Sequence, residues 1–422
     1  MNVLLDLALA LMAGLLMTRL FNRWHLPDVT AFLIAGVLIG PFVLGRIGGG
    51  VIGFSTYEEV AGFDVVNQVA MGFIAFSIGS EFRLSQLKKT GRQALVIGVV
   101  QSVFAALMVD AALIAFHFAF PSIISLPAAI TLGAIASATA PAATLMVVRQ
   151  YKAKGELTSL LLPIVALDDA VGLILFAVSF GAAKVIQSGQ INLISIVFDP
   201  LIEIVCSLIL GTLAGWVLTK LEASFHSNTN RNSLATSFVI LTAALATVSF
   251  DAGPVKIGFS PLLTCMMLGT VFCNICDFSD EIMARSSKWS SPVLACFFVL
   301  SGAALRLEVF GDYMLIILGA VYILSRSAGK YIGARLSSKA VHCSPNVVKY
   351  LGITLLPQAG VALGMCVTAQ SLGEDGLLIR NIILFSVLFY ELVGPIMTRN
   401  ALMASGDITA IPAGKSARVK NS

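Results

Sequence analysis

Two adjacent aspartates lie inside an apolar stretch. Asp168 and Asp169 interrupt the hydrophobic run from Leu160 to Val178. The run is long enough to cross a bilayer, where a carboxylate loses much of its hydration energy unless it is protonated, paired or hydrated. Because removal from water favours the neutral acid, such a group can hold either a proton or a small hard cation near neutral pH. The pair therefore predicts a site within the membrane that exchanges protons for cations.

Two basic residues in another apolar stretch are candidate partners for one of these carboxylates. Arg326 and Lys330 lie four residues apart within 313–335 and share one helix face. Neighbouring helical residues point about 100° apart, so Asp168 and Asp169 address different partners. We expect one aspartate to pair with Lys330 or Arg326 and the other to face water; a lysine can also lose its proton when such a pair breaks. Two simpler interpretations stay open: a structural ion network, or basic side chains that extend to the membrane surface.

The composition is that of a polytopic membrane protein. Of the 422 residues, 57% are hydrophobic and only 12% are charged, whereas soluble domains average about 25% charged residues. The first apolar stretch leads into a basic loop without a small-residue cleavage site, so we expect no cleaved signal. The seven cysteines are scattered through apolar segments and lack the further ligands of a zinc site, which favours a packing role.

Apolar segments recur along the whole chain. A hydrocarbon core about 30 Å thick needs about 20 helical residues to cross it. The sequence accordingly predicts an all-α polytopic membrane protein with about 13 transmembrane helices, joined by short polar loops. The predicted segments are 3–20, 27–45, 65–82, 94–117, 126–148, 159–184, 195–219, 233–250, 257–275, 289–305, 313–335, 347–371 and 377–398.

The distribution of Lys and Arg predicts the orientation. With the N-terminus outside and the C-terminus in the cytoplasm, 20 of the 27 basic residues fall in cytoplasmic loops. Two lie within a segment, and the five on the opposite side are Arg46, Lys184, Lys256, Arg306 and Arg380. This asymmetry is typical of the positive-inside rule and supports the number of segments, because one helix more or fewer would mix the two sides.

Two segments carry a proline near their middle. Segment 126–148 contains Pro141, and segment 347–371 contains Pro357 followed by Gln358. A proline frees a backbone carbonyl, which lipid does not tolerate unless protein or a water-lined cavity receives it. The two segments are seven apart and so cross in opposite directions, as in transporters built from inverted repeats, whose substrate site lies between interrupted helices. Ordinary proline kinks are the alternative.

Further polar groups accompany these breaks. Thr139 and the carbonyls freed beside Pro141 are candidate oxygen ligands for a dehydrated alkali ion. Two Gly–Pro pairs are a second sign of the repeat, because Gly40–Pro41 and Gly394–Pro395 each close an apolar run. Glu391, just before the second of these pairs, is a candidate cavity-lining residue.

These residues resemble the monovalent cation:proton antiporter superfamily, in particular its Kef-type and NapA-type branch. The run from Ala35 to Gly45 resembles the early "aGxxiGPxxLG" signature, and Gly72–Phe82 resembles the "GLE"-type helix that follows it. Ser291–Gly302 resembles the "FFxxxG" helix that precedes the lysine-bearing one. The pair Asp168–Asp169 matches the ion-binding motif of the paired-aspartate members. The likeness covers nearly the whole chain.

The resemblance implies roles for single residues. Asp169 is the main ion ligand, binding Na+ transiently, and Asp168 pairs with a lysine, for which Lys330 matches better than Arg326. One departure is Ala140, since many relatives carry Asp after the threonine of the first broken helix. The chain also lacks the cytosolic nucleotide-binding domain of ligand-gated potassium efflux members, so we expect no gating by nucleotide or glutathione.

The resemblance also implies a homodimer in which part of each chain moves. Scaffold helices carry the dimer contact, core helices carry the ion, and a linker helix and a tail complete the chain. The expected boundaries are 1–91 (scaffold), 92–187 (core), 188–222 (linker), 223–308 (scaffold), 309–400 (core) and 401–422 (short basic cytosolic tail).

We therefore expect a secondary antiporter that exchanges Na+, or else K+ or Li+, for H+ by elevator-type alternating access in the bacterial inner membrane. A cation-coupled symporter of a small organic anion is the alternative, and a channel or a non-transporting sensor is a third class. The sequence shows no nucleophile elbow, phosphate-binding loop or metal-ligand cluster. An enzyme, a bound cofactor and a nucleic-acid partner are accordingly not expected.

Overall fold

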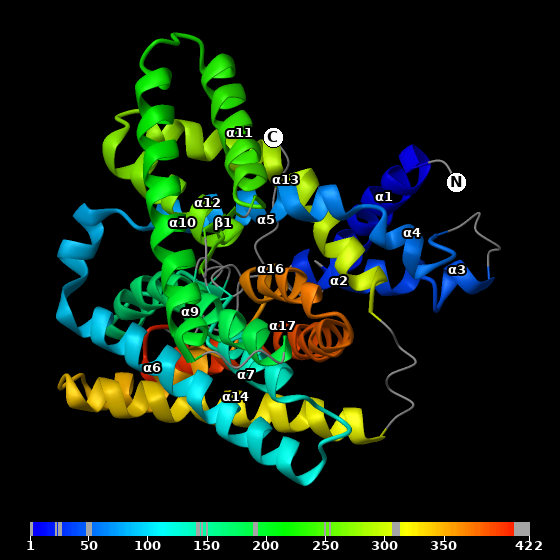
Figure 1. Cartoon of the computed structure of the whole chain (residues 1–422). Helices are drawn as coiled ribbons and strands as arrows, with labels where there is room; N and C mark the ends of the chain where they lie inside the picture. Colours follow the sequence, from blue (N-terminus) through cyan, green and yellow to red (C-terminus); the bar gives the residue numbers. More distant parts are fainter. Residues whose placement is uncertain are drawn as a thin grey trace.

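The computed structural model describes residues 3–21, 23, 28–47, 53–140, 144, 147–148, 151–188, 193–248, 250–252, 255–305 and 313–408. These residues are helical apart from connections and one short hairpin (Figure 1). The helices that precede the hairpin are α1 (Val3–Phe21), α2 (Asp28–Ile39), α3 (Leu44–Ile47), α4 (Tyr57–Ala61), α5 (Asp64–Glu81), α6 (Leu84–Ala119), α7 (Leu126–Ala136), α9 (Glu156–Gln187), α10 (Leu193–Glu222) and α11 (Asn228–Leu245). The remaining elements are β1 (Phe250–Ala252), β2 (Val255–Ile257), α12 (Pro261–Ile275), α13 (Ser279–Ala303), α14 (Tyr313–Ala340), α15 (Pro345–Thr354), α16 (Gly360–Ala369), the 3₁₀ turn η3 (Gln370–Leu372) and α17 (Glu374–Ser405).

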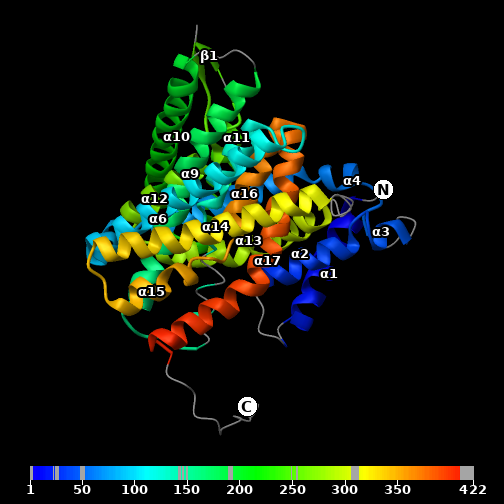
Figure 2. The ribbon, with the colours of Figure 1, turned by 90° about the horizontal axis from the view of Figure 1, so that it is seen from below.

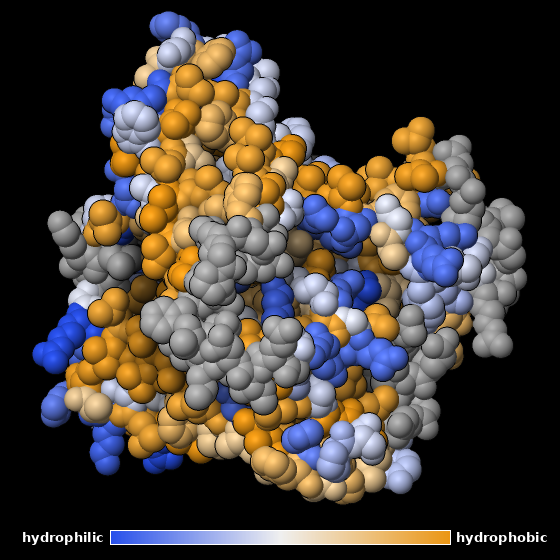
Figure 3. All heavy atoms as spheres, viewed as in Figure 1, coloured by the Kyte–Doolittle hydropathy of each residue, from blue (hydrophilic) through white to orange (hydrophobic). Residues whose placement is uncertain are grey.

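Six helices of the described residues are long and apolar enough to cross a membrane. Shorter apolar helices, such as Asp28–Ile39 and Pro261–Ile275, pack among them. Many large apolar side chains face outward; on α10, Leu201, Val205, Ile209 and Leu213 are each about half exposed. This spacing of four residues makes one continuous apolar stripe, and Figure 3 shows hydrophobic surface along the outer side of α10. Such a surface fits a lipid environment.

The helices pack in two groups. In one, α6 runs along α14, and α7, α9, α15, α16 and α17 pack around them (Figures 1 and 2). In the other, α2 packs against α1 and α13, and α5 packs against α11, α12 and α13. Helix α10 contacts both α12 and α9. The aspartate-bearing α9 therefore packs against α6, α10 and the helices of both interrupted segments, α7, α15 and α16.

Glycines let two helix pairs of the second group approach closely. A Cβ on Gly36 of α2 would lie 1.9 Å from the Val299 carbonyl oxygen, and one on Gly302 of α13 would lie 2.1 Å from that of Leu33. The same reciprocal contact joins α5 and α12 through Gly79 and Gly269. Such small-residue contacts hold helices together where lipid offers no hydrophobic driving force.

Gly36→Ala is expected to destabilise the protein by about 1–3 kcal/mol, because the added methyl group forces α2 away from the α13 backbone. Denaturant unfolding in detergent measures the change. Gly319→Ala in α14 is the matched control, since its Cβ would lie 3.4 Å from the Phe385 ring. Equal stability of the two variants would contradict the close packing of α2 on α13.

Several predicted boundaries differ from the structure for physical reasons. Segment 27–45 is not one helix, because Gly40 and Pro41 end α2 at Ile39. The two Gly–Pro pairs differ in their effect on the helix, because α17 continues through Pro395 to Ser405. The all-α prediction missed the hairpin, in which Phe250 pairs with Ile257. Helix α13 begins ten residues before the predicted 289, because its first turns are polar and hydropathy does not detect them.

Candidate functional site

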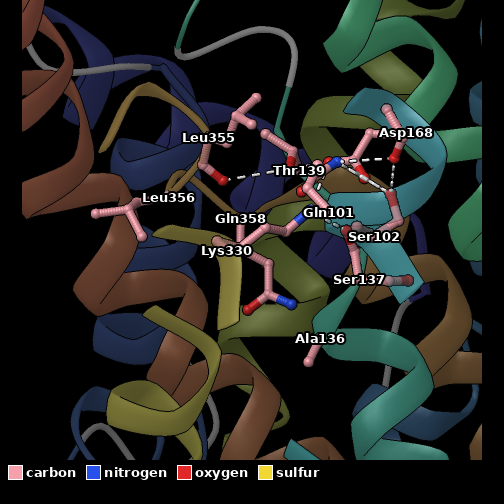
Figure 4. Close-up of polar contacts among 12 residues, drawn as sticks. Gln101, Ser102, Ala136, Ser137, Thr139, Asp168, Lys330, Leu355, Leu356 and Gln358 are labelled. Carbon is pink, nitrogen blue, oxygen red and sulfur yellow. Dashed lines mark hydrogen bonds and ion pairs between the residues drawn. The ribbon is translucent and has the colours of Figure 1, made fainter. Parts of the chain in front are cut away.

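Helix α9 places Asp168 at the centre of a buried hydrogen-bond network (Figure 4). Its Oδ1 accepts hydrogen bonds from Nε2 of Gln101, at 2.6 Å, and from the hydroxyl of Ser102, both on α6. Its Oδ2 accepts from Nζ of Lys330, at 2.6 Å, and from the hydroxyl of Thr139. A carboxylate offers about four lone-pair positions. Four protein donors therefore saturate Asp168 in this state.

Lys330 is the cation of this network. Its ammonium group is fully buried and donates a second hydrogen bond to the carbonyl oxygen of Ser137, directly after the last residue of α7. The C-terminal end of a helix carries partial negative charge, so the ammonium lies between a carboxylate and a helix end. A buried ion pair is stable only when further hydrogen bonds of this kind replace the lost hydration.

Asp169 is the second carboxylate at this depth. It follows Asp168 on α9, so its side chain leaves the helix about 100° away. It is 1% exposed. Asp168 and Asp169 are thus two buried carboxyl groups on the same turn of α9.

Arg326, one turn before Lys330 on α14, binds backbone rather than a carboxylate. Its Nε donates to the Ala136 carbonyl at 2.9 Å, Nη2 to that of Ala138 at 2.7 Å and Nη1 to that of Leu356 at 2.6 Å. The guanidinium also lies over the Tyr390 ring, 4.5 Å from its centroid. The planar fork of arginine donors suits several acceptors at once. Arg326 therefore satisfies carbonyls that both interrupted segments leave free.

The two interrupted segments contact each other directly. The second segment is broken between Thr354 and Gly360, and in the first α7 ends at Ala136. Ala140 N–H donates to the Pro357 carbonyl at 2.8 Å, and the Thr139 hydroxyl lies 3.2 Å from the Leu355 carbonyl. These contacts define the crossing, residues 135–140 and 354–360. The carbonyls and hydroxyls of the crossing are hard oxygen atoms, the kind of ligand that alkali cations prefer, and the Thr139 hydroxyl lies against Asp168.

Gln358 extends this polar centre away from the aspartates. Its Nε2 donates to the Ile135 carbonyl at 3.1 Å and lies 3.0 Å from the hydroxyl of Tyr322 on α14. Its Oε1 accepts from Ser386 on α17 at 3.1 Å. The amide therefore joins the crossing to two long helices.

Most of the site residues predicted from the sequence lie close together in the structure. Asp168, Thr139 and Lys330 form one network, and Asp169 adjoins it. Arg326, Pro357 and Gln358 lie at the crossing, and Pro141 lies outside the described residues. In this structure Lys330 contacts Asp168 while Arg326 contacts carbonyls, which separates the two cations that the sequence left as rivals.

The donors from α6 were not predicted from the sequence. Gln101 and Ser102 are an adjacent polar pair within the apolar stretch Ala94–Val109, which was a usable signal. Tyr322 and Ser386 were not predicted either, because a single polar residue on a long helix gives no sign of its partner.

A cavity of about 690 Å³ separates the two groups of helices. It lies between α9 and α16 on one side and α5, α11 and α12 on the other. Phe180 and Val367 lie on the first side, and Asp64 and Glu203 contribute carboxylates. Lys184 is placed over the Phe180 ring, 4.2 Å from its centroid. The cavity lies beside the C-terminal part of α9.

The fold and the site together define a class: an integral membrane protein with a buried carboxylate pair beside two interrupted, crossing helices. Within the described residues no group of three or more His, Cys, Asp and Glu side chains could hold a metal ion.

The chain belongs to the sodium/hydrogen exchanger transmembrane family, whose model matches residues 7–404. It is 21% identical over 346 residues to Na(+)/H(+) antiporter 1 of Methanocaldococcus jannaschii, covering 78% of this chain and 75% of that protein. It is 22% identical over 358 residues to Na(+)/H(+) antiporter NhaS4 of Synechocystis, covering 83% and 84%.

A solved structure has the same fold. The sodium proton antiporter MjNhaP1 from Methanocaldococcus jannaschii at pH 8 superposes with a TM-score of 0.75 at 17% identity, covering 96% of this chain and 98% of that one. At this identity the likeness establishes the fold. The Kef-type and NapA-type branch stays a prediction.

Proposed function

We propose that the protein is a secondary antiporter that exchanges a monovalent cation for H+. One observation carries the proposal: four donors saturate Asp168, and a second buried carboxylate, Asp169, follows it on α9, which packs against the interrupted segments whose carbonyls line the crossing. Asp169 then holds either a proton or a partly dehydrated cation, with the hydroxyl of Thr139 and the carbonyls as further ligands. Competition for one carboxylate couples the two fluxes. Family membership supports this reading.

Lys330 acts through Asp168 in this cycle. While the ion pair holds, Asp168 stays charged and α9 stays tied to α14 and to the end of α7. When the pair breaks, the lysine can give up a proton, which adds a second coupled proton. Na+ is the proposed cation, because the relatives of this chain are named as Na+/H+ antiporters. K+ and Li+ are the other candidates.

The proposed movement is an elevator-type displacement of a core against a scaffold. The two packing groups support it, because the helices around the crossing contact one another more than they contact α1, α2, α5 and α11. The proposed boundaries are 1–91 and 223–308 for the scaffold, 92–187 and 309–400 for the core, 188–222 for the linker and 401–422 for the tail. In this proposal the scaffold, linker and core together contain 13 membrane spans, arranged as an inverted repeat.

We further propose a homodimer in the bacterial inner membrane with the N-terminus outside and the C-terminus in the cytoplasm. The asymmetry of Lys and Arg supports the orientation. In this orientation the cavity beside Phe180 and Lys184 opens toward the outside. It is the proposed outer vestibule of the ion path.

Everted vesicles that contain the protein and a pH-sensitive dye test the function. Adding Na+ to acid-loaded vesicles is expected to release protons with saturable kinetics, and vesicles without the protein show no such response. Repeating the assay with Li+ and K+, with and without a membrane potential, gives the selectivity and the charge moved per cycle. No response to any alkali cation across the pH range would refute the proposal, and cation-dependent uptake of an organic anion would favour symport.

A further inference from the structure

Glu391 on α17 is a buried carboxyl group outside the site described above. It is 1% exposed, and its Oε2 lies 3.4 Å from the hydroxyl of Thr30 on α2. Its Oε1 has no hydrogen-bond partner among the described residues. The ion pairs that these residues form do not include Glu391. A buried carboxyl group with one long hydrogen bond is rare in proteins and calls for a proton or water.

The same part of α17 contacts the crossing. The ring of Tyr390 lies under the guanidinium of Arg326, and a Cβ on Gly394 would lie 2.9 Å from Pro357. The side chain of Glu391 leaves α17 about 100° from that of Tyr390 and meets α2 instead. One helix therefore contacts the crossing on one side and α2 on another. A displacement of the crossing against α2 cannot leave the contact of Glu391 unchanged.

A second polar group lies on the same face of α17. Thr398 follows Glu391 by seven residues, which brings it back to within about 20° of the same direction. Its hydroxyl is fully buried and has no partner among the described residues. Glu391 and Thr398 are thus two polar side chains on one face of α17, with Thr398 two turns nearer its C-terminal end.

Few charges surround this carboxyl group. Arg326 donates to three carbonyls, and Lys330 to Asp168 and a carbonyl, so both basic groups are engaged elsewhere. On α17 itself the adjacent titratable group is Tyr390, whose hydroxyl donates to the Ile323 carbonyl. Nearer its ends α17 carries Glu374, Asp375, Arg380 and Arg399. The other ionisable side chains on the helices packed against α17 are Asp28 of α2, Glu156, Asp168, Asp169 and Lys184 of α9, Tyr313, Tyr322, Tyr331, Arg335 and Lys339 of α14, Lys349 and Tyr350 of α15, and Cys366 of α16.

We propose that Glu391 is a second proton-binding site, placed between the moving core and scaffold helix α2, where its proton controls the movement. This inference rests on the proposed antiport cycle. In the packed state seen here, the neutral acid fits against Thr30 and its apolar surroundings. When the core moves, the carboxyl group leaves Thr30, meets water and transfers its proton to that water. The charged carboxylate then opposes return to the packed state until it binds a proton again.

Glu391→Gln tests the proposal, because glutamine keeps the shape and the bond to Thr30 but cannot release a proton. Exchange in vesicles is expected to fall about tenfold and to keep only the pH dependence that proton competition at Asp169 imposes, with the KM for Na+ nearly unchanged. Glu391→Asp, which retains a titratable group, is expected to recover most of the rate and the pH dependence. The control is Glu222→Gln, which removes another buried carboxylate, one paired with Arg231 at 4.0 Å. Because Glu222 lies on α10 and not between the core and α2, this variant is expected to exchange like wild type.

A wild-type rate and pH profile in Glu391→Gln would overturn the inference and leave the antiport itself intact, whereas a wild-type protein without exchange refutes the antiport. Thr30→Val keeps the carboxyl group and provides a second test. Loss of the hydroxyl is expected to shift the pH of half-maximal exchange by about half a unit. An unchanged midpoint in Thr30→Val would count against a titrating Glu391 even where the glutamine variant does not fold.

Discussion

Asp169→Asn is expected to abolish cation-driven proton exchange in vesicles. The amide is neutral and cannot accept a proton in exchange for a metal ion, so the step that couples the two fluxes disappears. Removing one partner of a buried charge interaction costs about 3–5 kcal/mol, which corresponds to at least a hundredfold loss of affinity or rate. The side chain is 1% exposed, so bulk water does not compensate for the lost charge.

Asp168→Asn is the informative comparison, because it removes the neighbouring carboxylate on the same turn of α9. This variant loses the ion pair with Lys330 but keeps an oxygen that can accept from Thr139. We expect slower exchange with an altered number of charges moved per cation, rather than complete loss. Sodium-evoked flux at the wild-type rate in the Asp169→Asn protein would show that the ion binds elsewhere. Thermal unfolding of both variants separates loss of transport from loss of fold.

The sequence predicted those features of the site that are local in the chain. A pair of carboxylates in an apolar run is costly wherever the run lies in the membrane, so Asp168 and Asp169 are visible without a structure. The break at Pro357 is local too, because a proline alters its own turn of helix. The position of Lys330 against Asp168, by contrast, depends on how α14 packs along α6, which hydropathy does not report.

The features that the sequence did not predict depend on packing between helices. Gly40–Pro41 ends α2, yet Gly394–Pro395 leaves α17 intact, because a helix supported by neighbours on several sides tolerates one missing hydrogen bond. Gln101 and Ser102 become donors to Asp168 only when α6 and α9 pack together. The sequence of one apolar segment does not show which residue its polar pair contacts. The four hydrogen bonds to Asp168 could therefore not be predicted from the sequence.

Arg326→Ala is expected to be the most destabilising single change at the crossing. The fully buried guanidinium donates to the carbonyls of Ala136, Ala138 and Leu356, three residues that are themselves buried. Each buried polar group left without a partner costs about 1–3 kcal/mol. Loss of all three contacts therefore predicts a destabilisation of about 4 kcal/mol or more, measured by denaturant unfolding in detergent.

Two substitutions separate the geometry of Arg326 from its charge. Arg326→Lys keeps the positive charge but has one nitrogen, which cannot reach the carbonyls of both interrupted segments at once, so we expect it to recover less than half of the loss. Arg285→Ala removes an arginine whose bond to Glu281 is exposed, and it is expected to change stability by less than about 0.5 kcal/mol. If Arg326→Lys were as stable as wild type, charge alone would hold the crossing together. If Arg326→Ala were no worse than Arg285→Ala, the two interrupted helices would have to satisfy their carbonyls without it, and the ion ligands assigned to the crossing would need to be sought among different oxygens.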